Sequence, residues 1–255
     1  MKRLITILTL FFIFINLSVF AESNIIKKDL KVITDDGFRI QAVLEYSKSL
    51  KKEKNVSTVV LVHSLGYSSG WWENLPDELL AKGYAVLLID LRGHGGSIYN
   101  SKLARVSWKN LTNHAFSKYP SDVLKVFDFV ASENPKKEFF NNWAIVGADI
   151  GANTAVVAAS KYKNKPKTVV MLSPSVSARG IYIPVKLAEL GNVDILSISS
   201  SSDNNAIKTN EYLKKFAQAE YVQFSSESRS NGMLMLKNDK NLVGFITSWI
   251  DQYLR

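Results

Sequence analysis

Short, continuous apolar segments alternate with helix-patterned segments from residue 57 to residue 254, and no other feature constrains the fold as strongly. A segment without a polar face is typical of a strand that helices cover on both faces of a sheet. This alternation predicts a mostly parallel sheet with right-handed crossovers. We expect strands at residues 57–63, 84–90, 142–147, 167–173, 192–199 and 220–226, and helices at residues 72–83, 121–133, 150–161, 205–218 and 241–254.

The segment before residue 57 has a different pattern. Residues 29–47 alternate apolar and polar side chains around Asp35, Asp36 and Gly37, which predicts an antiparallel hairpin. Residues 91–119 are polar and irregular. The connection between the strands at 167–173 and 192–199 is short, so any lid over the sheet must be small. The chain has 255 residues and no internal repeat, which suits one domain.

Three motifs follow strands in this pattern. They are "VVLVHSLGYSSGWW" at residues 59–72, "LLIDLRGHGGS" at residues 87–97 and "VGADIGANTA" at residues 146–155. In this order and spacing, the chain resembles the α/β-hydrolase superfamily, in its serine-esterase and peptidase-like branch. The resemblance implies an α/β fold of one domain: a mostly parallel eight-stranded sheet flanked by helices, with an N-terminal antiparallel hairpin and little or no lid.

The third motif looks like the nucleophile elbow of that superfamily, G-x-S-x-G, with Asp149 in place of the serine. Gly147 and Gly151 leave room for the tight turn. The start of a helix favours an anion, so a carboxylate is tolerated there. Asp149 is either a nucleophile, as in the haloalkane dehalogenases and epoxide hydrolases of this fold, or an aspartate that only caps the helix.

The loop after the first parallel strand resembles the family's oxyanion loop, but Ser64 stands where the family usually has glycine. We expect the pocket to be formed by Ser64, Leu65 and Ile150, with the backbone N–H groups of Leu65 and Ile150 as the oxyanion donors. His63, at the end of the strand, and His94, in the second motif, are expected to be structural.

The resemblance places the triad acid after the strand at 192–199 and the histidine after the strand at 220–226. Asp203 and Asn231 occupy these triad-equivalent positions. All three histidines precede the elbow, so no histidine follows the last strand. Asparagine cannot act as a general base at neutral pH. His114 is the remaining candidate for a replacement base, and we do not favour it.

Two hypotheses follow. The first is a catalytically impaired hydrolase-fold protein that binds a small-molecule or acyl-type ligand in the elbow pocket. The second is an active hydrolase of the esterase, epoxide hydrolase or dehalogenase type, with Asp149 as its nucleophile. A weaker third view makes the protein a structural partner with an interface formed by Trp71, Trp72, Trp108 and Trp143, although aromatic residues at such positions are more often part of the core. We expect no cofactor and no metal, because the chain has no cysteine and no His/Asp/Glu cluster with ligand spacing.

The N-terminus predicts export. Lys2 and Arg3 precede an almost wholly apolar segment at residues 4–20, and Ala21 fits a cleavage site, so residues 1–21 are interpreted as a signal peptide and residues 22–255 as the domain. An uncleaved anchor helix is the alternative. We therefore expect a periplasmic or extracellular protein.

The chain carries a formal charge of +9, or +7 without Lys2 and Arg3. We interpret the scattered lysines as a solvated surface, with attraction to an anionic envelope surface as the alternative. No motif predicts nucleic-acid binding. The oligomeric state stays open.

Overall fold

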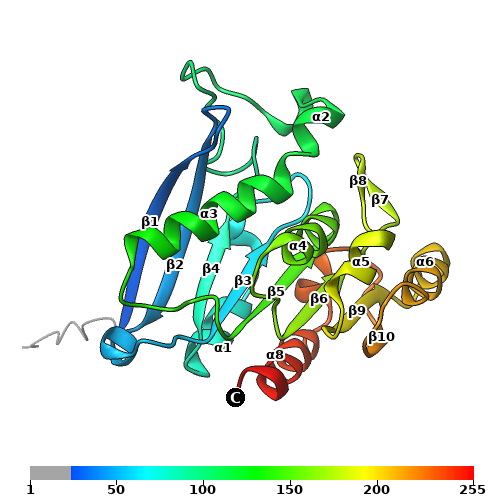
Figure 1. The fold of residues 1–255 in the computed structure, drawn as a ribbon. Helices are drawn as coiled ribbons and strands as arrows, with labels where there is room; N and C mark the ends of the chain where they lie inside the picture. The colour runs from blue at the N-terminus through cyan, green and yellow to red at the C-terminus, as the bar shows by residue number, and fades with distance from the viewer. Residues whose placement is uncertain (1–23) are drawn as a thin grey trace, which may run out of the picture.

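The computed structural model describes residues 24–255, so the predicted signal peptide lies outside the described residues. An eight-stranded sheet forms the centre of the molecule, in the order β1-β2-β4-β3-β5-β6-β9-β10 (Figure 1). Its strands are β1 (Ile25–Ile33), β2 (Arg39–Ser47), β3 (Thr58–Val62), β4 (Ala85–Ile89), β5 (Trp143–Ala148), β6 (Thr168–Leu172), β9 (Asp194–Ser200) and β10 (Tyr221–Ser226).

The strands are parallel from β4 to β10, whereas β1 and β2 form an antiparallel pair and β2 runs antiparallel to β4. This confirms the predicted fold class. The central strands β3, β4, β5 and β6 are buried along their whole length, as their continuous apolar sequences indicate.

Helices cover both faces of the sheet. The core is accordingly divided into two clusters of buried side chains. Val60 and Val62 of β3 face the cluster of α3 and α4, and Val59 and Leu61 face the cluster of α1 and α8. The longer helices are α1 (Leu75–Ala81), α3 (Tyr119–Glu133), α4 (Ile150–Lys161), α5 (Pro184–Leu190), α6 (Asn204–Lys214) and α8 (Leu242–Leu254).

Several small elements have no counterpart in the sequence prediction. They are the helices α2 (Asn113–Phe116) and α7 (Leu234–Asn238), the 3-10 helices η1 (Lys48–Lys52), η2 (Ser69–Trp71) and η3 (Trp108–Asn110), and the hairpin β7 (Ser177–Ala178) and β8 (Ile181–Tyr182). Elements of two to five residues are too short to show a periodicity. The β7–β8 hairpin and α5 form the small lid segment between β6 and β9 (Figure 1).

Within residues 24–255, no helix has both the length and the apolar character that crossing a bilayer requires.

Candidate functional site

The elbow lies where β5 ends and α4 begins. Asp149 has φ 54° and ψ −121°, a backbone conformation that is strained for a side chain other than glycine. A Cβ on Gly147 would overlap the backbone of Gly151 and Ala152, and a Cβ on Gly151 would overlap the carbonyl oxygen of Val62. The two glycines therefore let α4 pack directly against the strands, and the tight turn carries Asp149 at its tip.

The Asp149 side chain turns toward the oxyanion loop. The backbone N–H of Leu65 donates to Asp149 Oδ2 at 3.3 Å. Burial raises the pKa of Asp149, while hydrogen bonds from the Ile150 and Leu65 backbones and the charge of Arg179 act in the opposite direction. The two backbone groups that we expected to bind an oxyanion thus both face the carboxylate of this chain itself.

Ser64 is part of a different contact. Its hydroxyl accepts a hydrogen bond from the Met233 N–H at 3.1 Å, and its backbone N–H donates to the Met233 sulfur at 3.3 Å. Ser64 is buried. Its side chain therefore fastens the loop after β10 to the oxyanion loop.

Asp203 and Asn231 come together, although they are 28 residues apart in the chain. Asn231 Nδ2 donates to Asp203 Oδ2 at 3.2 Å. The other carboxylate oxygen, Oδ1, accepts from the backbone N–H groups of Asn205 and Ala206, so Asp203 caps α6. Asn231 is exposed and Asp203 is half-buried. The two side chains that the sequence analysis assigned to triad-equivalent positions are therefore in contact.

The Asn231 loop also reaches the elbow. A Cβ built on Gly232 would lie 3.5 Å from the Asp149 Cβ, which puts the residue after Asn231 in contact distance of the aspartate. The Gly232 N–H donates to Ser173 Oγ at 2.9 Å. The structure therefore gathers Leu65, Asp149 and the loop with Asn231 at one edge of the sheet.

The histidines are used in other ways. His63 is buried, with Nδ1 2.8 Å from the Ser64 carbonyl oxygen and Nε2 accepting from the Leu91 N–H at 2.9 Å. Burial, with a smaller contribution from His94, lowers the pKa of His63 to about 4. His94 Nε2 accepts from the Gly66 N–H at 2.9 Å. Both neutral rings hold the oxyanion loop in place.

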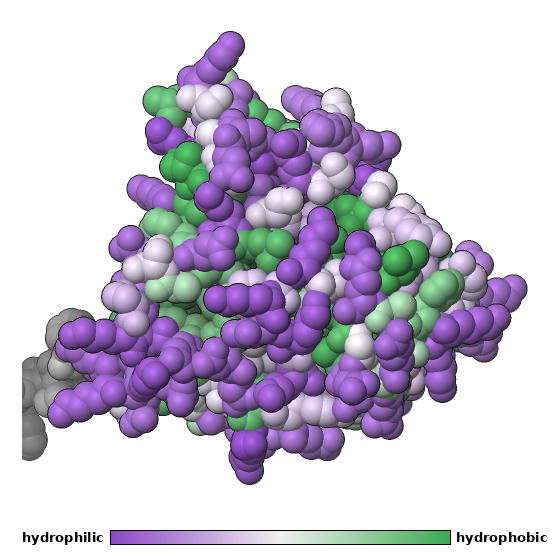
Figure 2. Space-filling view, in the orientation of Figure 1, coloured by the Kyte–Doolittle hydropathy of each residue, from purple (hydrophilic) through white to green (hydrophobic). Residues whose placement is uncertain are grey.

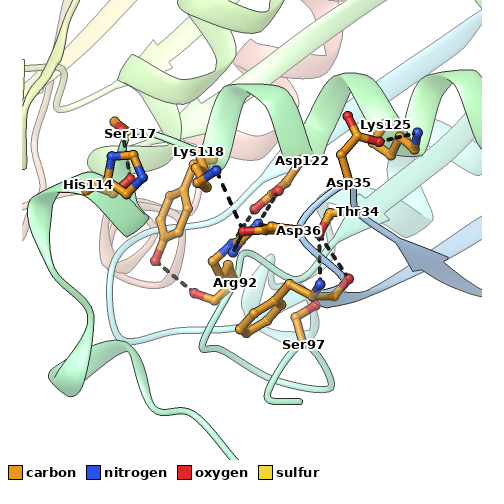
Figure 3. A network of polar contacts seen from close by, with 12 residues as sticks. Thr34, Asp35, Asp36, Arg92, Ser97, His114, Ser117, Lys118, Asp122 and Lys125 are labelled. Carbon is orange, nitrogen blue, oxygen red and sulfur yellow. Dashed lines mark hydrogen bonds and ion pairs between the residues drawn. The ribbon is translucent and has the colours of Figure 1, made fainter. Parts of the chain in front are cut away.

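His114 lies in α2 and is exposed. Figure 3 shows it beside Ser117, whose hydroxyl donates to the His114 carbonyl oxygen, and away from the ion pairs drawn in the same view.

Those ion pairs support the second motif. The buried Arg92 guanidinium binds Asp36 at 2.7 Å and Asp122 at 2.7 Å, and Lys118 lies 3.7 Å from Asp36 (Figure 3). Arg92 thereby ties the β1–β2 hairpin to α3. Its carbonyl oxygen accepts from the Tyr119 hydroxyl at 2.9 Å. The turn that carries His94 is therefore rigidly held.

Sequence reasoning missed two residues near the elbow. Arg179, at the tip of the β7–β8 hairpin, is exposed and close enough to act electrostatically on Asp149. Ser173 has φ 52° and accepts the Gly232 N–H. Nothing in the sequence motifs marks Ser173, and only the neighbouring Gly180 marks the Arg179 turn. Among residues 24–255, no group of three or more His, Cys, Asp or Glu side chains is arranged to hold a metal ion.

The comparisons with known proteins agree with the fold. Residues 53–227, more than half of the chain, match the family described as serine aminopeptidase, S33. The chain belongs to this family. This family match and the solved structures that are similar to the chain together place the chain in the α/β-hydrolase superfamily. No curated protein matches the chain.

Several solved structures share the fold. A dienelactone hydrolase from Anabaena variabilis has a TM-score of 0.68 at 16% identity, over 91% of this chain and 100% of that chain. An esterase from Pyrococcus furiosus has a TM-score of 0.66 at 15% identity, over 90% and 91%. The esterase from Exiguobacterium antarcticum has a TM-score of 0.64 at 11% identity, over 88% and 100%. At these identities the likeness shows the fold alone.

Proposed function

We propose that this member of the serine aminopeptidase S33 family is a catalytically impaired α/β hydrolase that binds a ligand at the elbow without turning it over. One observation carries the proposal. The Asp149 carboxylate accepts the Leu65 N–H, which is the group that would stabilise the oxyanion of an ester substrate. A carbonyl oxygen of a substrate would have to displace this carboxylate before any chemistry began.

The missing base supports the same conclusion. Asn231 keeps the contact with Asp203 at 3.2 Å, but an amide has no nitrogen that accepts a proton at neutral pH. The ring nitrogens of His63 and His94 are occupied by backbone groups. Members of a catalytic triad act as a unit, so the absence of the base alone removes most of the rate.

The alternative is an active hydrolase that uses Asp149 as its nucleophile. The strained backbone at Asp149, with φ 54°, favours this alternative because it presents the side chain as an elbow nucleophile would be presented. Attack by the carboxylate on an epoxide or alkyl halide would form an ester on Asp149. Its hydrolysis needs an activated water, and Asn231 cannot supply the base. The ester would accumulate.

The ligand of our proposal is a small molecule of acyl type. Its carbonyl group would replace the Asp149 carboxylate at the N–H groups of Leu65 and Ile150. Asp149 therefore competes with the ligand, and a variant without the carboxylate should bind acyl-type ligands more tightly.

We further propose, from the N-terminal sequence, that the protein acts in the periplasm or outside the cell after removal of residues 1–21. Mass spectrometry of the N-terminus in each cell fraction tests this.

Steady-state turnover separates the two functions. The chain from Glu22 onward is assayed with short and medium acyl esters, an epoxide and a haloalkane, beside Asp149→Asn. We expect no turnover above buffer for either protein. Turnover that disappears in Asp149→Asn would overturn the proposal in favour of the Asp-dependent hydrolase. Intact mass after incubation with the epoxide would then show whether the ester on Asp149 accumulates.

Restoration of the triad gives the positive control. We expect measurable ester hydrolysis from Asp149→Ser combined with Asn231→His, because Asp203 is already placed to orient the new imidazole. The control combines Asp149→Ser with Asn164→His. It adds the same two residue types but puts the histidine on an exposed loop at the opposite end of β5 from the elbow, and it should stay inactive. A folded double variant at Asp149 and Asn231 with no gain would contradict the assignment of Asn231 to the histidine position.

A further inference from the structure

Ten of the 24 lysines in residues 24–255 lie on three connected loops. The loops are residues 48–54, 133–138 and 161–167, and we call their common surface the lysine face. The Glu138 N–H donates to the Lys54 carbonyl oxygen at 2.7 Å, which joins the first two loops. The third loop is joined through residues just beyond the second, because Asn164 Nδ2 donates to Asn141 Oδ1 at 3.3 Å.

The lysine face carries nearly all of the net charge of the described chain. Its three loops contain ten lysines and three glutamates, a formal charge of +7. Residues 24–255 carry +8 in total, because Lys2, Arg3 and Glu22 contribute +1 of the chain's +9. The rest of the described molecule is therefore close to neutral, and its positive potential is concentrated on one side.

Internal contacts do not explain this concentration. Lys54 forms an ion pair with Glu138 at 2.8 Å, and Lys161 complements the end of α4. Lys137 Nζ donates to the carbonyl oxygens of Leu50 and Glu53, and Lys165 Nζ donates to that of Ser160. These acceptors are neutral, so they leave the positive charge of the two lysines uncompensated. Seven of the ten are exposed: Lys51, Lys52, Lys54, Lys136, Lys161, Lys163 and Lys167.

The position of the lysine face indicates what it meets. Asn24, the first described residue, accepts a hydrogen bond from the Lys48 N–H at 2.8 Å, so the described chain begins at the edge of this face. In the sequence, the almost wholly apolar residues 4–20 precede this point. Figure 2 shows mostly hydrophilic residues at the lower left of the molecule, where Figure 1 has the lower ends of β1 and β2.

The elbow lies at the other end. β5 begins with Trp143, whose indole N–H donates to the Asn164 carbonyl oxygen of the lysine face at 3.0 Å. The strand ends one residue before Asp149, and six strand residues span about 20 Å. A surface bound to the lysine face would leave the elbow pointing away from it and open to solvent.

We infer that the lysine face docks the protein on an anionic lipid membrane. Clusters of four to eight lysines have the charge to bind acidic lipid headgroups, and the lysine face has ten lysines, seven of them exposed. The inference does not depend on catalysis, nor on whether residues 1–21 are cleaved, because both outcomes leave the face intact.

Vesicle co-sedimentation tests the inference. Residues 24–255 contain the whole sheet and both core clusters, so the chain from Glu22 onward keeps the fold. We expect it to bind vesicles of phosphatidylcholine with phosphatidylglycerol and not vesicles of phosphatidylcholine alone. Binding should be lost when salt rises from about 0.1 M to about 1 M, because the Debye length falls from about 10 Å to about 3 Å.

Matched variants separate the face from the net charge. Lys51→Glu, Lys52→Glu and Lys163→Glu together should weaken vesicle binding by about tenfold or more. The control changes three exposed lysines elsewhere, Lys102→Glu, Lys208→Glu and Lys240→Glu, with the same change in net charge. We expect about a twofold effect or less from the control. Circular dichroism melts check that both variants fold.

Three results would overturn the inference. They are equal binding to the two kinds of vesicle, equal losses in the face variant and the control, and binding to soluble polyglutamate or heparin without binding to anionic vesicles.

Discussion

At the elbow, the Asp149 carboxylate and the Leu65 N–H satisfy each other's hydrogen-bonding needs at 3.3 Å. Under the proposed function, this one residue affects two parts of a hydrolase site, because an aspartate stands at the expected serine position and its carboxylate occupies an expected oxyanion donor. Burial has the largest effect on the pKa of Asp149 and raises it. The hydrogen bonds to the carboxylate therefore do not fully offset its loss of hydration. Asn231 likewise has a hydrogen-bond partner, because its amide group donates to the Asp203 carboxylate at 3.2 Å.

Asp149→Asn should raise the free energy of unfolding at neutral pH. The pKa of Asp149 is raised in the folded protein, so its stabilising contribution is present at low pH and is lost as pH rises through that pKa. The asparagine removes the buried charge and keeps an oxygen for the Leu65 N–H. Urea unfolding of both proteins from pH 7 down to pH 3 should show a gain that shrinks as the pH falls. A constant difference, or a loss at pH 7, would contradict the prediction.

Among the elements, the packing of α4 against β3 and β5 decides the shape of the site. Both contacts depend on glycine, because a Cβ on Gly147 or Gly151 has no space. The buried helix α4 consists largely of small residues, which lets it lie close to the sheet. The tight turn at Asp149 follows from this close approach, and so does the placement of the Ile150 N–H beside the carboxylate.

Two Gly→Ala substitutions should therefore have opposite effects on the free energy of unfolding. Gly151→Ala puts a Cβ against the Val62 carbonyl oxygen and should destabilise the protein by about 2–3 kcal/mol or more. Gly244→Ala in α8 meets no atom within 4 Å and should stabilise it by about 0.5–1 kcal/mol. Urea unfolding at one pH measures both. Destabilisation of similar size in the two variants would show that the space at Gly151 is not the cause.

At the scale of the whole molecule, the excess positive charge and the buried histidines lie at opposite ends of the sheet. The positive charge collects on the lysine face, at the beginning of the strands, and the buried imidazoles of His63 and His94 lie at the ends of the strands near the elbow. The fold therefore carries its excess positive charge at one end and the elbow at the other. Its stability to acid depends on the second end.

We expect the free energy of unfolding to fall by roughly 2 kcal/mol between about pH 7 and about pH 5. The folded protein lowers the pKa of His63 to about 4, so the stabilising effect is complete above the unfolded pKa of about 6.5 and is lost as pH falls toward 4. The pKa of His94 is lowered too, in the same direction. Urea unfolding in the Asp149→Asn background, where the elbow carboxyl no longer titrates, measures the change. A flat profile would contradict the prediction.

The sequence by itself determined the fold class and the strand order along the chain. Continuous apolar segments such as residues 84–90 and the small-residue helix at 150–161 carry local signals, because burial on both faces and helical packing act on neighbouring residues. The elbow with its aspartate was predicted from the resemblance of residues 146–155 to a family motif. Tertiary structure alone decided which groups meet: the Leu65 N–H with Asp149, Asn231 with Asp203, Arg179 near the elbow, and three distant loops in one lysine face. Leu65 and Asp149 are 84 residues apart in the sequence, and Asp203 and Asn231 are 28 apart. A local sequence pattern does not show which distant residues will come into contact.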